Sequence, residues 1–343
     1  MSPTAQIQLR SLSCRCSVLS RLALLPRSMA MQGAKVMIND LKKGVSKGAG
    51  AVDAGTRDGD NQEARLVSDG DGVVEEIRAL GGIASANYDD VSDWAGAENM
   101  INQTVEEFGD INVLICNAGI LRDRTMLNMS ESEWDLIFQV HCKGSFAPAH
   151  FAGNYWKNKS KETGQPQDAR VIFTTSQVGI FGNYGQSNYA AAKAANAMFA
   201  MTLAGELDRY GVTVNAVCPS GITRMTEDLR PDFGSEELAL EKEKMARQHV
   251  TNEFVEGSPN NVAPLIAWLV SPDGADVTGR VFNTNAFANG YQIAESFSVT
   301  PWKTKEGENW THDEIGETMS EMLADETRPT IYDNHMAAAR SRM

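Results

Sequence analysis

Short apolar runs alternate along most of the chain with longer segments in which apolar residues recur at helical spacing. The apolar, β-branched runs predict strands near residues 34–39, 83–87, 112–116, 170–175, 212–218 and 280–284. The helical spacing predicts helices near residues 71–80, 94–108, 131–155, 187–209 and 260–270. Strands that alternate with helices predict an α/β fold with a doubly wound parallel sheet.

The same pattern predicts how the chain is divided. Residues 1–32 form an atypical leader, residues 33–295 the α/β domain, and residues 296–343 a polar C-terminal extension. The extension holds one predicted helix, which opens with a capping box that runs from Thr311 to Glu314.

Composition narrows the class of protein. With 343 residues, of which 42% are hydrophobic, the chain is long enough to bury a sizeable core as one domain. The net charge of −14 argues against nucleic acid or an anionic membrane surface as a partner. The apolar patch at residues 22–25 is too short to span a membrane. The five cysteines lack metal-ligand spacing, so no metal site is predicted.

The segment SQVGIFGNYGQSNYAAAK, residues 176–193, places a hydroxyl, a phenol and an ammonium where hydride-transfer chemistry needs them. Tyr189 and Lys193 are four residues apart in an Ala-rich run, so they share one face of the predicted helix. A cation that close favours the phenolate, which is expected to lower the pKa of Tyr189 and make it a usable acid and base. Ser176 follows a predicted strand and is placed to polarise a substrate carbonyl. Ser176, Tyr189 and Lys193 are therefore the predicted catalytic residues.

A second Tyr-x-x-x-Lys pair, Tyr155 and Lys159, has the same spacing. No strand and serine precede it, and a polar loop follows, so we interpret it as a solvated helix end. The order of strand, serine, glycine-containing loop and helix separates the catalytic pair from this one.

These motifs resemble those of the short-chain dehydrogenases/reductases, and the similarity runs from about residue 33 to residue 290. The matching segments read INDL, ANYDDV, CNAGILRDRTM, DLIFQVHCKGSF, GNYGQSNYAAAK and VNAVCPSGITRMT. Within the family the chain most resembles the 3-hydroxyacyl-CoA dehydrogenase type of peroxisomal multifunctional enzymes. The resemblance implies a Rossmann-like sheet, a nicotinamide dinucleotide as hydride carrier, and a homodimer or homotetramer. It also implies that residues 225–256 form a helical lid over the substrate.

The resemblance assigns roles residue by residue. Tyr189 is the acid and base, Lys193 holds the nicotinamide ribose and lowers the tyrosine pKa, and Ser176 binds the substrate oxygen. His141 stands where the wider family often has Asn, a replacement that the hydroxyacyl-CoA type tolerates. Besides Tyr189 and Lys193, the implied cofactor-binding residues are Asp40, Asp90, Val91, Asn117, Ala118, Gly119, Pro219, Ile222 and Thr223.

Asp40 bears on the choice of cofactor. It follows the apolar run at 34–39, and an acid at the end of the second strand of a dinucleotide fold accepts hydrogen bonds from the adenosine ribose and repels a 2′-phosphate. The sequence therefore favours NAD over NADP. The alternative is that Asp40 is only a turn residue after a strand.

The residues before Asp40 depart from the dinucleotide-binding pattern. Such a fold begins with a strand, a glycine-rich turn and a helix, because only glycine lets the backbone approach a pyrophosphate closely. The chain has no glycine before Gly33, so the first strand, the phosphate turn and the first helix are predicted to be missing. The glycines of GVSKGAG, residues 44–50, match the spacing of the turn. Gly and Asp nevertheless break the following residues, where a helix is required.

The two ends of the chain suggest different addresses. Residues 1–32 are rich in Arg and Ser and contain no acid, which is typical of a mitochondrial or plastid transit peptide; an incorrectly assigned start is the alternative. Ser341, Arg342 and Met343 form a relative of the C-terminal peroxisomal signal. Because the resembled enzymes act in peroxisomes, the peroxisome is preferred to the mitochondrion and the cytosol.

Two functions stay open from the sequence. The first is an oxidoreductase that interconverts a secondary alcohol and a ketone on an acyl thioester or lipid-like substrate, using NAD(H). The second is a catalytically defective family member that cannot hold the dinucleotide and acts only as an oligomer partner. The catalytic residues favour the first and the missing glycine-rich turn favours the second. A CoA ester would also need a basic rim, for which the candidates are Arg122, Arg124 and Arg224.

Overall fold

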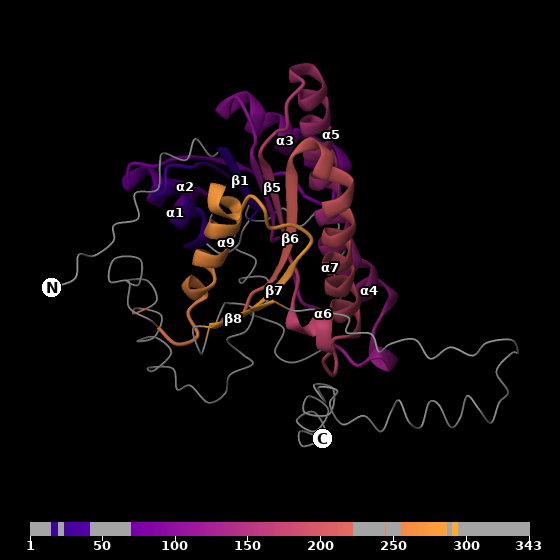
Figure 1. Cartoon of the computed structure of the whole chain (residues 1–343). Coiled ribbons are helices and arrows are strands. Elements are labelled where there is room, and N and C mark those ends of the chain that lie inside the picture. The colour runs from indigo at the N-terminus through magenta and orange to yellow at the C-terminus, as the bar shows by residue number, and fades with distance from the viewer. Residues whose placement is uncertain are drawn as a thin grey trace, which may run out of the picture.

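The computed structural model describes residues 15–19, 24–41, 70–221, 244, 255–286 and 290–293 (Figure 1). These residues build an eight-stranded sheet in the order β3-β2-β1-β4-β5-β6-β7-β8. Its strands pair in parallel, except that β8 runs antiparallel to β7 at one edge. The strand bounds are β1 Arg15–Leu19, β2 Lys35–Asn39, β3 Ile83–Asn87, β4 Val113–Cys116, β5 Ala169–Thr174, β6 Val212–Cys218, β7 Val281–Asn285 and β8 Gly290–Ile293.

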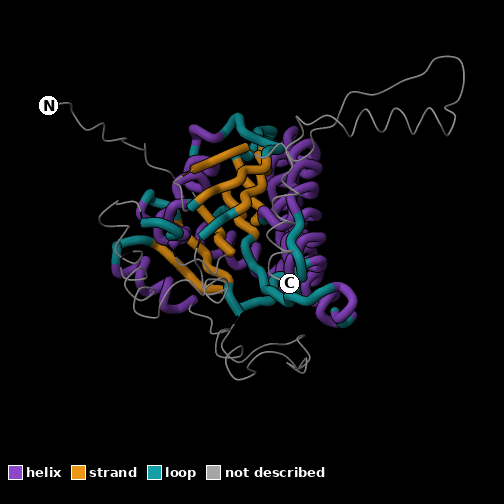
Figure 2. The backbone as a smooth tube through the Cα atoms, turned by 90° about the horizontal axis from the view of Figure 1, so that it is seen from below, coloured by secondary structure: helices purple, strands orange, loops and turns teal. Residues whose placement is uncertain are grey.

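Helices cover both faces of the sheet, as Figures 1 and 2 show. One face carries α1 (Leu24–Met31), α2 (Gly70–Ala79) and α9 (Ala263–Val270). The other carries α3 (Trp94–Phe108), α4 (Glu131–Phe138), α5 (Gly144–Thr163) and α7 (Ser187–Leu207), with the short α6 (Gln177–Phe181) packed on α7. Single 3-10 turns lie at Met126–Asn128, Asp208–Tyr210, Pro259–Asn261 and Pro272–Gly274. The predicted α/β, doubly wound, Rossmann-like architecture is confirmed.

Each face of the sheet has its own apolar core. Trp156 and Phe173 are fully buried between the sheet and the helices α3, α5 and α7. Ile38, Ile77 and Leu269 are buried on the opposite face. Strand β4, with the sequence VLIC, is buried along its whole length because helices cover both of its faces, which is why it reads as a continuous apolar run.

The prediction that the first strand and first helix are missing is wrong. Strand β1 lies between β2 and β4 and pairs with both in parallel, and α1 follows it. The sequence of β1, RCSVL, is short and carries only a weak strand signal, because few of its residues are β-branched or aromatic. Residues 20–23, which connect β1 to α1, contain no glycine and lie outside the described residues.

Other departures from the predicted elements are local. The helix predicted at 131–155 is divided into α4 and α5 by a π-helical turn at Gln139–Lys143. The short α6 and the antiparallel β8 were not predicted. The loop at 42–70 and the lid at 225–256 lie almost entirely outside the described residues, and the extension at 296–343 lies wholly outside them.

Two properties of the described part of the chain bear on function. No helix in it is long and apolar enough to cross a membrane. It also holds no group of three or more His, Cys, Asp or Glu side chains arranged to bind a metal ion.

Candidate active site

The carboxyl ends of the parallel strands meet at one edge of the sheet, where the strand order reverses between β1 and β4. Leu19, the last residue of β1, pairs with Asn39 of β2 on one side and with Cys116 of β4 on the other. The chain leaves β1 for α1 on one face and leaves β4 for α4 on the other. In open α/β sheets such a switch point forms the crevice in which ligands bind.

The structure brings the predicted catalytic residues together near this edge. Ser176 follows β5 and caps α6, where its Oγ accepts a hydrogen bond from Val178 N at 3.2 Å. Tyr189 lies in the first turn of α7, and the Ser176 side chain acts on its phenol in the direction that lowers the Tyr189 pKa. Lys193, one turn later, is buried; its Nζ donates to Thr174 O at 2.8 Å and lies 5.6 Å from the centroid of the Tyr189 ring.

A glycine allows this close arrangement of α6 and α7. A Cβ added at Gly179 would lie 2.7 Å from both Ala194 N and the Lys193 carbonyl carbon. Backbone atoms at that distance cannot move aside without displacing a helix. Gly179 therefore lets α6, which Ser176 caps, lie directly on the segment of α7 that carries Lys193.

His141 joins the turn after β4 to Tyr189. It is buried in the π-helical turn, and its ring lies edge-on to the Tyr189 ring with the centroids 5.2 Å apart. Its Nε2 lies 3.2 Å from Ile120 N and 2.8 Å from Ile120 O, so the tautomer decides which hydrogen bond forms. A Cβ added at Gly119 would lie 2.6 Å from His141 Cε1. The third residue of the Asn-Ala-Gly turn must therefore be small.

Asp40 and Asn117 follow the ends of β2 and β4. Asp40 N donates to Asn87 O at 3.1 Å, and Asp40 Oδ1 accepts from Leu41 N at 2.9 Å. Asn117 Oδ1 accepts a hydrogen bond from Thr174 Oγ1 at 2.8 Å, which connects the ends of β4 and β5. Ala118, next in the turn, packs against the core.

The other predicted cofactor residues are placed as follows. Asp90 Oδ1 accepts from both Ser92 N and Ser92 Oγ, at 2.8 and 2.7 Å, which fixes the turn after β3. Val91 is buried against Gly144, where an added Cβ would lie 2.8 Å from Val91 Cγ2. Pro219 follows the end of β6, while Ile222 and Thr223 lie outside the described residues.

A polar cluster beside Asp40 was not predicted. Asn39 Nδ2 donates to Asn87 Oδ1 at 2.6 Å and to Asp89 O at 2.9 Å. Asn87 Nδ2 in turn donates to Asp89 Oδ2 at 2.7 Å and to Gln103 Oε1 at 2.8 Å. The sequence signal was an asparagine at the last position of two apolar strands. The cluster holds the ends of β2 and β3 together at the place where Asp40 begins its turn.

The described residues suit a dinucleotide at its adenosine end. Asp40 follows the second strand, where an adenosine ribose is bound in such folds. Lys193 lies beside Tyr189, with its Nζ 5.6 Å from the ring centroid. The crevice between β1 and β4 lies between these two residues in the order of the strands. The segment that would meet the pyrophosphate, residues 20–23, lies outside the described residues.

Comparison with known proteins identifies the family. The family profile described as short chain dehydrogenase matches residues 57–233. The chain belongs to the short-chain dehydrogenase/reductase family. Its relatives include the peroxisomal multifunctional and hydroxyacyl-CoA dehydrogenase types that its motifs predicted.

Three similar proteins show the extent of the match. A peroxisomal hydratase-dehydrogenase-epimerase of Neurospora crassa is 39% identical over 251 residues, which are 73% of this chain and 23% of that protein. This dehydrogenase thus spans less than a quarter of that relative's length. The hydroxyacyl-CoA dehydrogenase ChsB1 of Mycobacterium tuberculosis is 35% identical over 74% of this chain and 70% of its own. A crystal structure of a short chain dehydrogenase from Mycobacterium avium is 33% identical with a TM-score of 0.70, over 92% of this chain and 96% of that one.

Burial controls the ionisation of Tyr189 and Lys193 in this chain. It raises the pKa of Tyr189 to about 12, because a buried phenolate is poorly solvated, and the hydrogen bond from Ser176 offsets part of that effect. Burial also lowers the pKa of Lys193 to about 8. The expectation that Lys193 lowers the pKa of Tyr189 is wrong for this structure, because the ammonium points to Thr174 O rather than to the phenol. Tyr189 is thus a neutral phenol near pH 7 and is ready to act as an acid.

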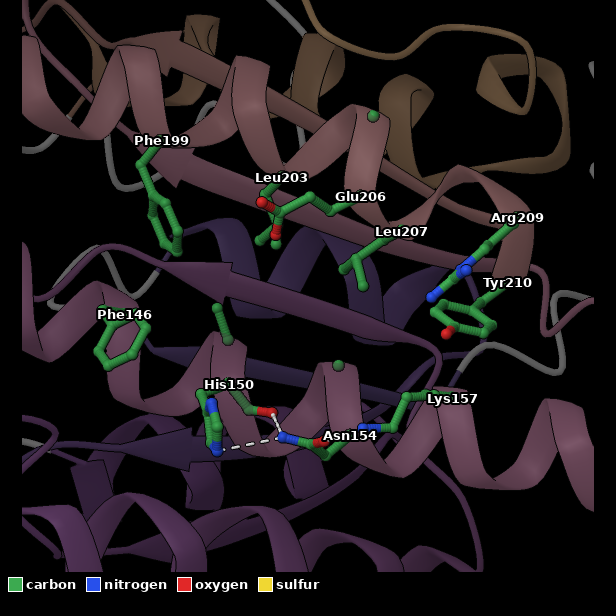
Figure 3. Close-up of a pocket in the computed structure, with 13 residues that line it drawn as sticks. Phe146, His150, Asn154, Lys157, Phe199, Leu203, Glu206, Leu207, Arg209 and Tyr210 are labelled. Carbon is green, nitrogen blue, oxygen red and sulfur yellow. Dashed lines mark hydrogen bonds between the residues drawn. The ribbon is translucent and has the colours of Figure 1, made fainter.

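A separate hollow of about 630 Å³ lies between α5 and α7 (Figure 3). Phe146 and Phe199 face it from the two helices, and Lys157 and Glu206 place opposite charges on its lining. None of the three predicted catalytic residues lines it. The hollow therefore does not belong to the candidate active site.

Proposed function

We propose that this short-chain dehydrogenase interconverts a secondary alcohol and a ketone on an acyl thioester or similar lipid-like substrate, with NAD(H) as its hydride carrier. The observation that supports the proposal most directly is the buried Lys193, whose Nζ lies 5.6 Å from the centroid of the Tyr189 ring, with Ser176 at the cap of the neighbouring α6. These residues supply a phenol, a hydroxyl and an ammonium at the carboxyl ends of the parallel strands. Such groups are suited to the reduction of a carbonyl by a nicotinamide dinucleotide.

The residues divide the chemistry between them. In the reductive direction, a nicotinamide dinucleotide held at this site would supply the hydride that the carbonyl carbon accepts. Ser176 and Tyr189 donate hydrogen bonds to the carbonyl oxygen and so hold it in place. Tyr189 then gives its proton to that oxygen as negative charge develops there, and it takes a proton back in the oxidative direction. Lys193, one helical turn from Tyr189, would hold the nicotinamide ribose of the dinucleotide.

The carboxylates that follow β2 and β3 favour NAD over NADP. Asp40 follows β2, and Asp89 and Asp90 follow the neighbouring β3. A 2′-phosphate bound at the end of β2 would bring negative charge close to these carboxylates, whereas a ribose diol can donate hydrogen bonds to Asp40. We therefore assign Asp40 to the adenosine ribose.

The substrate class follows from the relatives. Two of them are named for hydroxyacyl-CoA or hydratase-dehydrogenase activity. Of the basic residues expected to meet an anionic CoA ester, Arg124 is bonded through Nε to Glu133 Oε1 at 2.6 Å, and Arg122 donates to Leu121 O at 2.7 Å. Arg224 lies outside the described residues. Peroxisomal relatives also support the peroxisome as the compartment.

We further expect a homodimer or homotetramer. Light scattering of the purified chain measures the mass of the assembly and so tests this expectation.

The alternative function, a defective family member that serves only as an oligomer partner, rests on one observation. Residues 20–23 contain no glycine, and a pyrophosphate that lost several charge-assisted hydrogen bonds, at about 1.5–3 kcal/mol each, would bind a thousandfold or more weakly.

Calorimetric titration of the full chain with NAD and then NADP separates these two functions. We expect NAD to bind more tightly than NADP. The variant Asp40→Asn should weaken NAD binding by about tenfold or more, because a charge-assisted hydrogen bond is lost. Glu131→Gln, which neutralises an exposed acid on α4, serves as the matched control.

Activity is then measured with a 3-hydroxyacyl-CoA substrate. Tyr189→Phe should bind NAD like the original chain and lose turnover. A folded chain that binds neither dinucleotide would overturn the proposal and leave the oligomer-partner function. NAD binding without turnover on acyl-CoA substrates would retain the cofactor and reject the substrate class.

A further inference from the structure

A buried asparagine ends each of the neighbouring strands β2 and β3. Asn39 is the last residue of β2 and Asn87 the last residue of β3, and the two are paired in the parallel register. Only 7% of Asn39 and 3% of Asn87 is exposed. The three residues before Asn39, VMI, are apolar and buried, so an apolar residue would continue the strand equally well. A buried amide is costly unless its hydrogen bonds are made, so we ask what these two amides hold.

The Asn87 side chain makes four hydrogen bonds, the full set for an amide group with two donors and two lone pairs. Oδ1 accepts from Asn39 Nδ2 at 2.6 Å and from Asp89 N at 3.1 Å. Nδ2 donates to Asp89 Oδ2 at 2.7 Å and to Gln103 Oε1 at 2.8 Å. The backbone carbonyl of Asn87 also accepts from Asp40 N at 3.1 Å. Asn87 therefore bonds to both of the acidic turns that follow β2 and β3.

The same network fixes the orientation of the Asn39 amide. Its Nδ2 donates both hydrogens, one to Asn87 Oδ1 and one to Asp89 O at 2.9 Å. A reversed amide would place Oδ1 against these two acceptors, so the network allows one orientation. Helix α3 holds Asp89 as well, because Asn99 Nδ2 donates to Asp89 Oδ2 at 2.7 Å. The turn after β3 is thus held from β2, from β3 and from α3.

Fixed turns matter for the choice between two ribose groups. A carboxylate accepts hydrogen bonds from a ribose diol and repels a 2′-phosphate, and the repulsion depends on its distance from the phosphate. A turn that could move would let its carboxylate withdraw from the phosphate, so strong discrimination needs a rigid support. The bonds of Asn39 and Asn87 supply such a support for the turns of Asp40 and Asp89.

We propose that Asn39 and Asn87 are positioning residues for the choice of cofactor: by fixing the turns of Asp40 and Asp89, they make the adenosine end of the site select a ribose diol over a 2′-phosphate. This inference rests on the proposed use of NAD(H). It adds that Asp40 alone does not determine the preference, because two buried amides without contact to the hydride-transfer residues hold its turn in place.

Two variants separate the role in positioning from the role in stability. Asn87→Leu keeps the approximate size of the side chain and removes its four hydrogen bonds, so it should destabilise the chain by leaving the Asn39 amide unpaired. Asn39→Leu/Asn87→Leu removes both members of the pair. Its unfolding free energy should recover toward that of the parent chain, because two apolar side chains replace two bonded amides.

Asn215→Leu is the matched control. Asn215 is fully buried in β6, where its Nδ2 donates to Val277 O at 2.7 Å and its Oδ1 accepts from Arg280 N at 3.1 Å. Strands β1, β4 and β5 separate β6 from β2. This variant therefore removes a buried amide of the same kind without touching the turns after β2 and β3.

Ligand-observed NMR titration with adenosine and with adenosine 2′-phosphate measures the choice at the adenosine end alone. Neither probe carries a pyrophosphate, so residues 20–23 do not enter the comparison. We expect the parent chain to bind adenosine more tightly. The ratio of the two Kd values should fall about threefold or more in Asn39→Leu/Asn87→Leu, as expected when a carboxylate moves away from a phosphate in a screened site. It should not change in Asn215→Leu. A merely structural role would weaken both probes equally, and an unchanged ratio in the double variant would overturn the inference.

Residue-resolved hydrogen exchange tests the same inference without a ligand. The Asp40 amide is the informative one, because its acceptor is the backbone carbonyl of residue 87, which every variant retains. Its exchange should become about tenfold faster in the double variant and stay unchanged in Asn215→Leu. Unchanged exchange of Asp40 in the double variant would overturn the inference.

The outcomes also distinguish this inference from the proposed function. If the probe ratio and the Asp40 exchange both change as expected in a chain that does not turn over acyl-CoA substrates, the inference is retained and the proposed reaction is rejected. If the double variant keeps the preference for the diol while the parent chain is an active NAD-dependent enzyme, the inference is overturned and the proposed function stands. A parent chain that shows no preference for adenosine contradicts the inference directly.

Discussion

Gly119→Ala should disturb the catalytic phenol through His141. The added Cβ would lie 2.6 Å from His141 Cε1, a distance that carbon atoms do not tolerate, so the imidazole must move. Gly119 is not among the glycines with positive φ, so alanine adds no backbone strain there. The steric contact with one ring is therefore the whole expected effect.

The size of the effect follows from what holds the ring. His141 is buried, its Nε2 is bonded to the Ile120 backbone, and its ring lies edge-on to Tyr189 with the centroids 5.2 Å apart. Insertion of a methyl group into such a packed site costs about 1–3 kcal/mol of unfolding free energy. Because the displaced ring contacts Tyr189, a tenfold or larger fall in kcat should accompany it, as about 1.4 kcal/mol of lost transition-state stabilisation implies.

A double-mutant cycle with His141→Ala tests this reasoning. In the background without the imidazole, Gly119→Ala should cost less than about 0.5 kcal/mol, which gives a coupling energy of about 1–2 kcal/mol. Denaturant unfolding of the four proteins measures the cycle. If the two substitutions are additive in stability, the contact between Gly119 and His141 does not determine the residue at position 119, and the reasoning is refuted.

Two further predictions concern α6 and α7. Gly179→Ala should destabilise the chain by about 1–3 kcal/mol and lower kcat, because its Cβ would meet the backbone of α7 at 2.7 Å. The matched control in denaturant unfolding is Gly205→Ala. An added Cβ at Gly205 has no atom within 4 Å, so this variant should be neutral or stabilising. Burial lowers the pKa of Lys193 from its ordinary 10.5 to about 8, so between these values the unfolded chain binds more protons and the Lys193 contribution to stability rises with pH. Lys193→Met should remove that rise. Unfolding free energies that keep the same slope from pH 8 to 10.5 in both proteins would contradict the assignment.

The sheet was largely predictable from sequence because its central strands are buried on both faces. Runs such as VLIC of β4 have no polar side to present, so their apolar residues are consecutive and easily recognised. The proximity of Tyr189 and Lys193 was also predictable, because residues four positions apart on a helix always lie on the same face. Both signals are local, and neither depends on residues far away in the chain.

The ionisation of the pair was not predictable in the same way. The sequence shows that a lysine lies one turn from a tyrosine, but not that its Nζ donates to Thr174 O from the neighbouring strand. It also does not show that Asp123, 66 residues before Tyr189, contributes a negative charge. The pKa of a buried group depends on every element packed around it, and here those elements come from β4, β5, β6 and two helices.

Strand β1 shows how a position in a sheet can be defined by its neighbours. The sequence RCSVL carries a weak strand signal. Strand β1 nevertheless lies between β2 and β4, and the backbone groups of both neighbours form hydrogen bonds with it. The register brings the end of β1 level with the ends of β2 and β4, which Asp40 and Asn117 follow. Strand β1 therefore ends where a dinucleotide fold binds the pyrophosphate, although residues 20–23, which follow it in sequence, contain no glycine. Measured NAD affinity thus tests whether a correctly placed strand and helix are sufficient for this site without the glycine-rich turn.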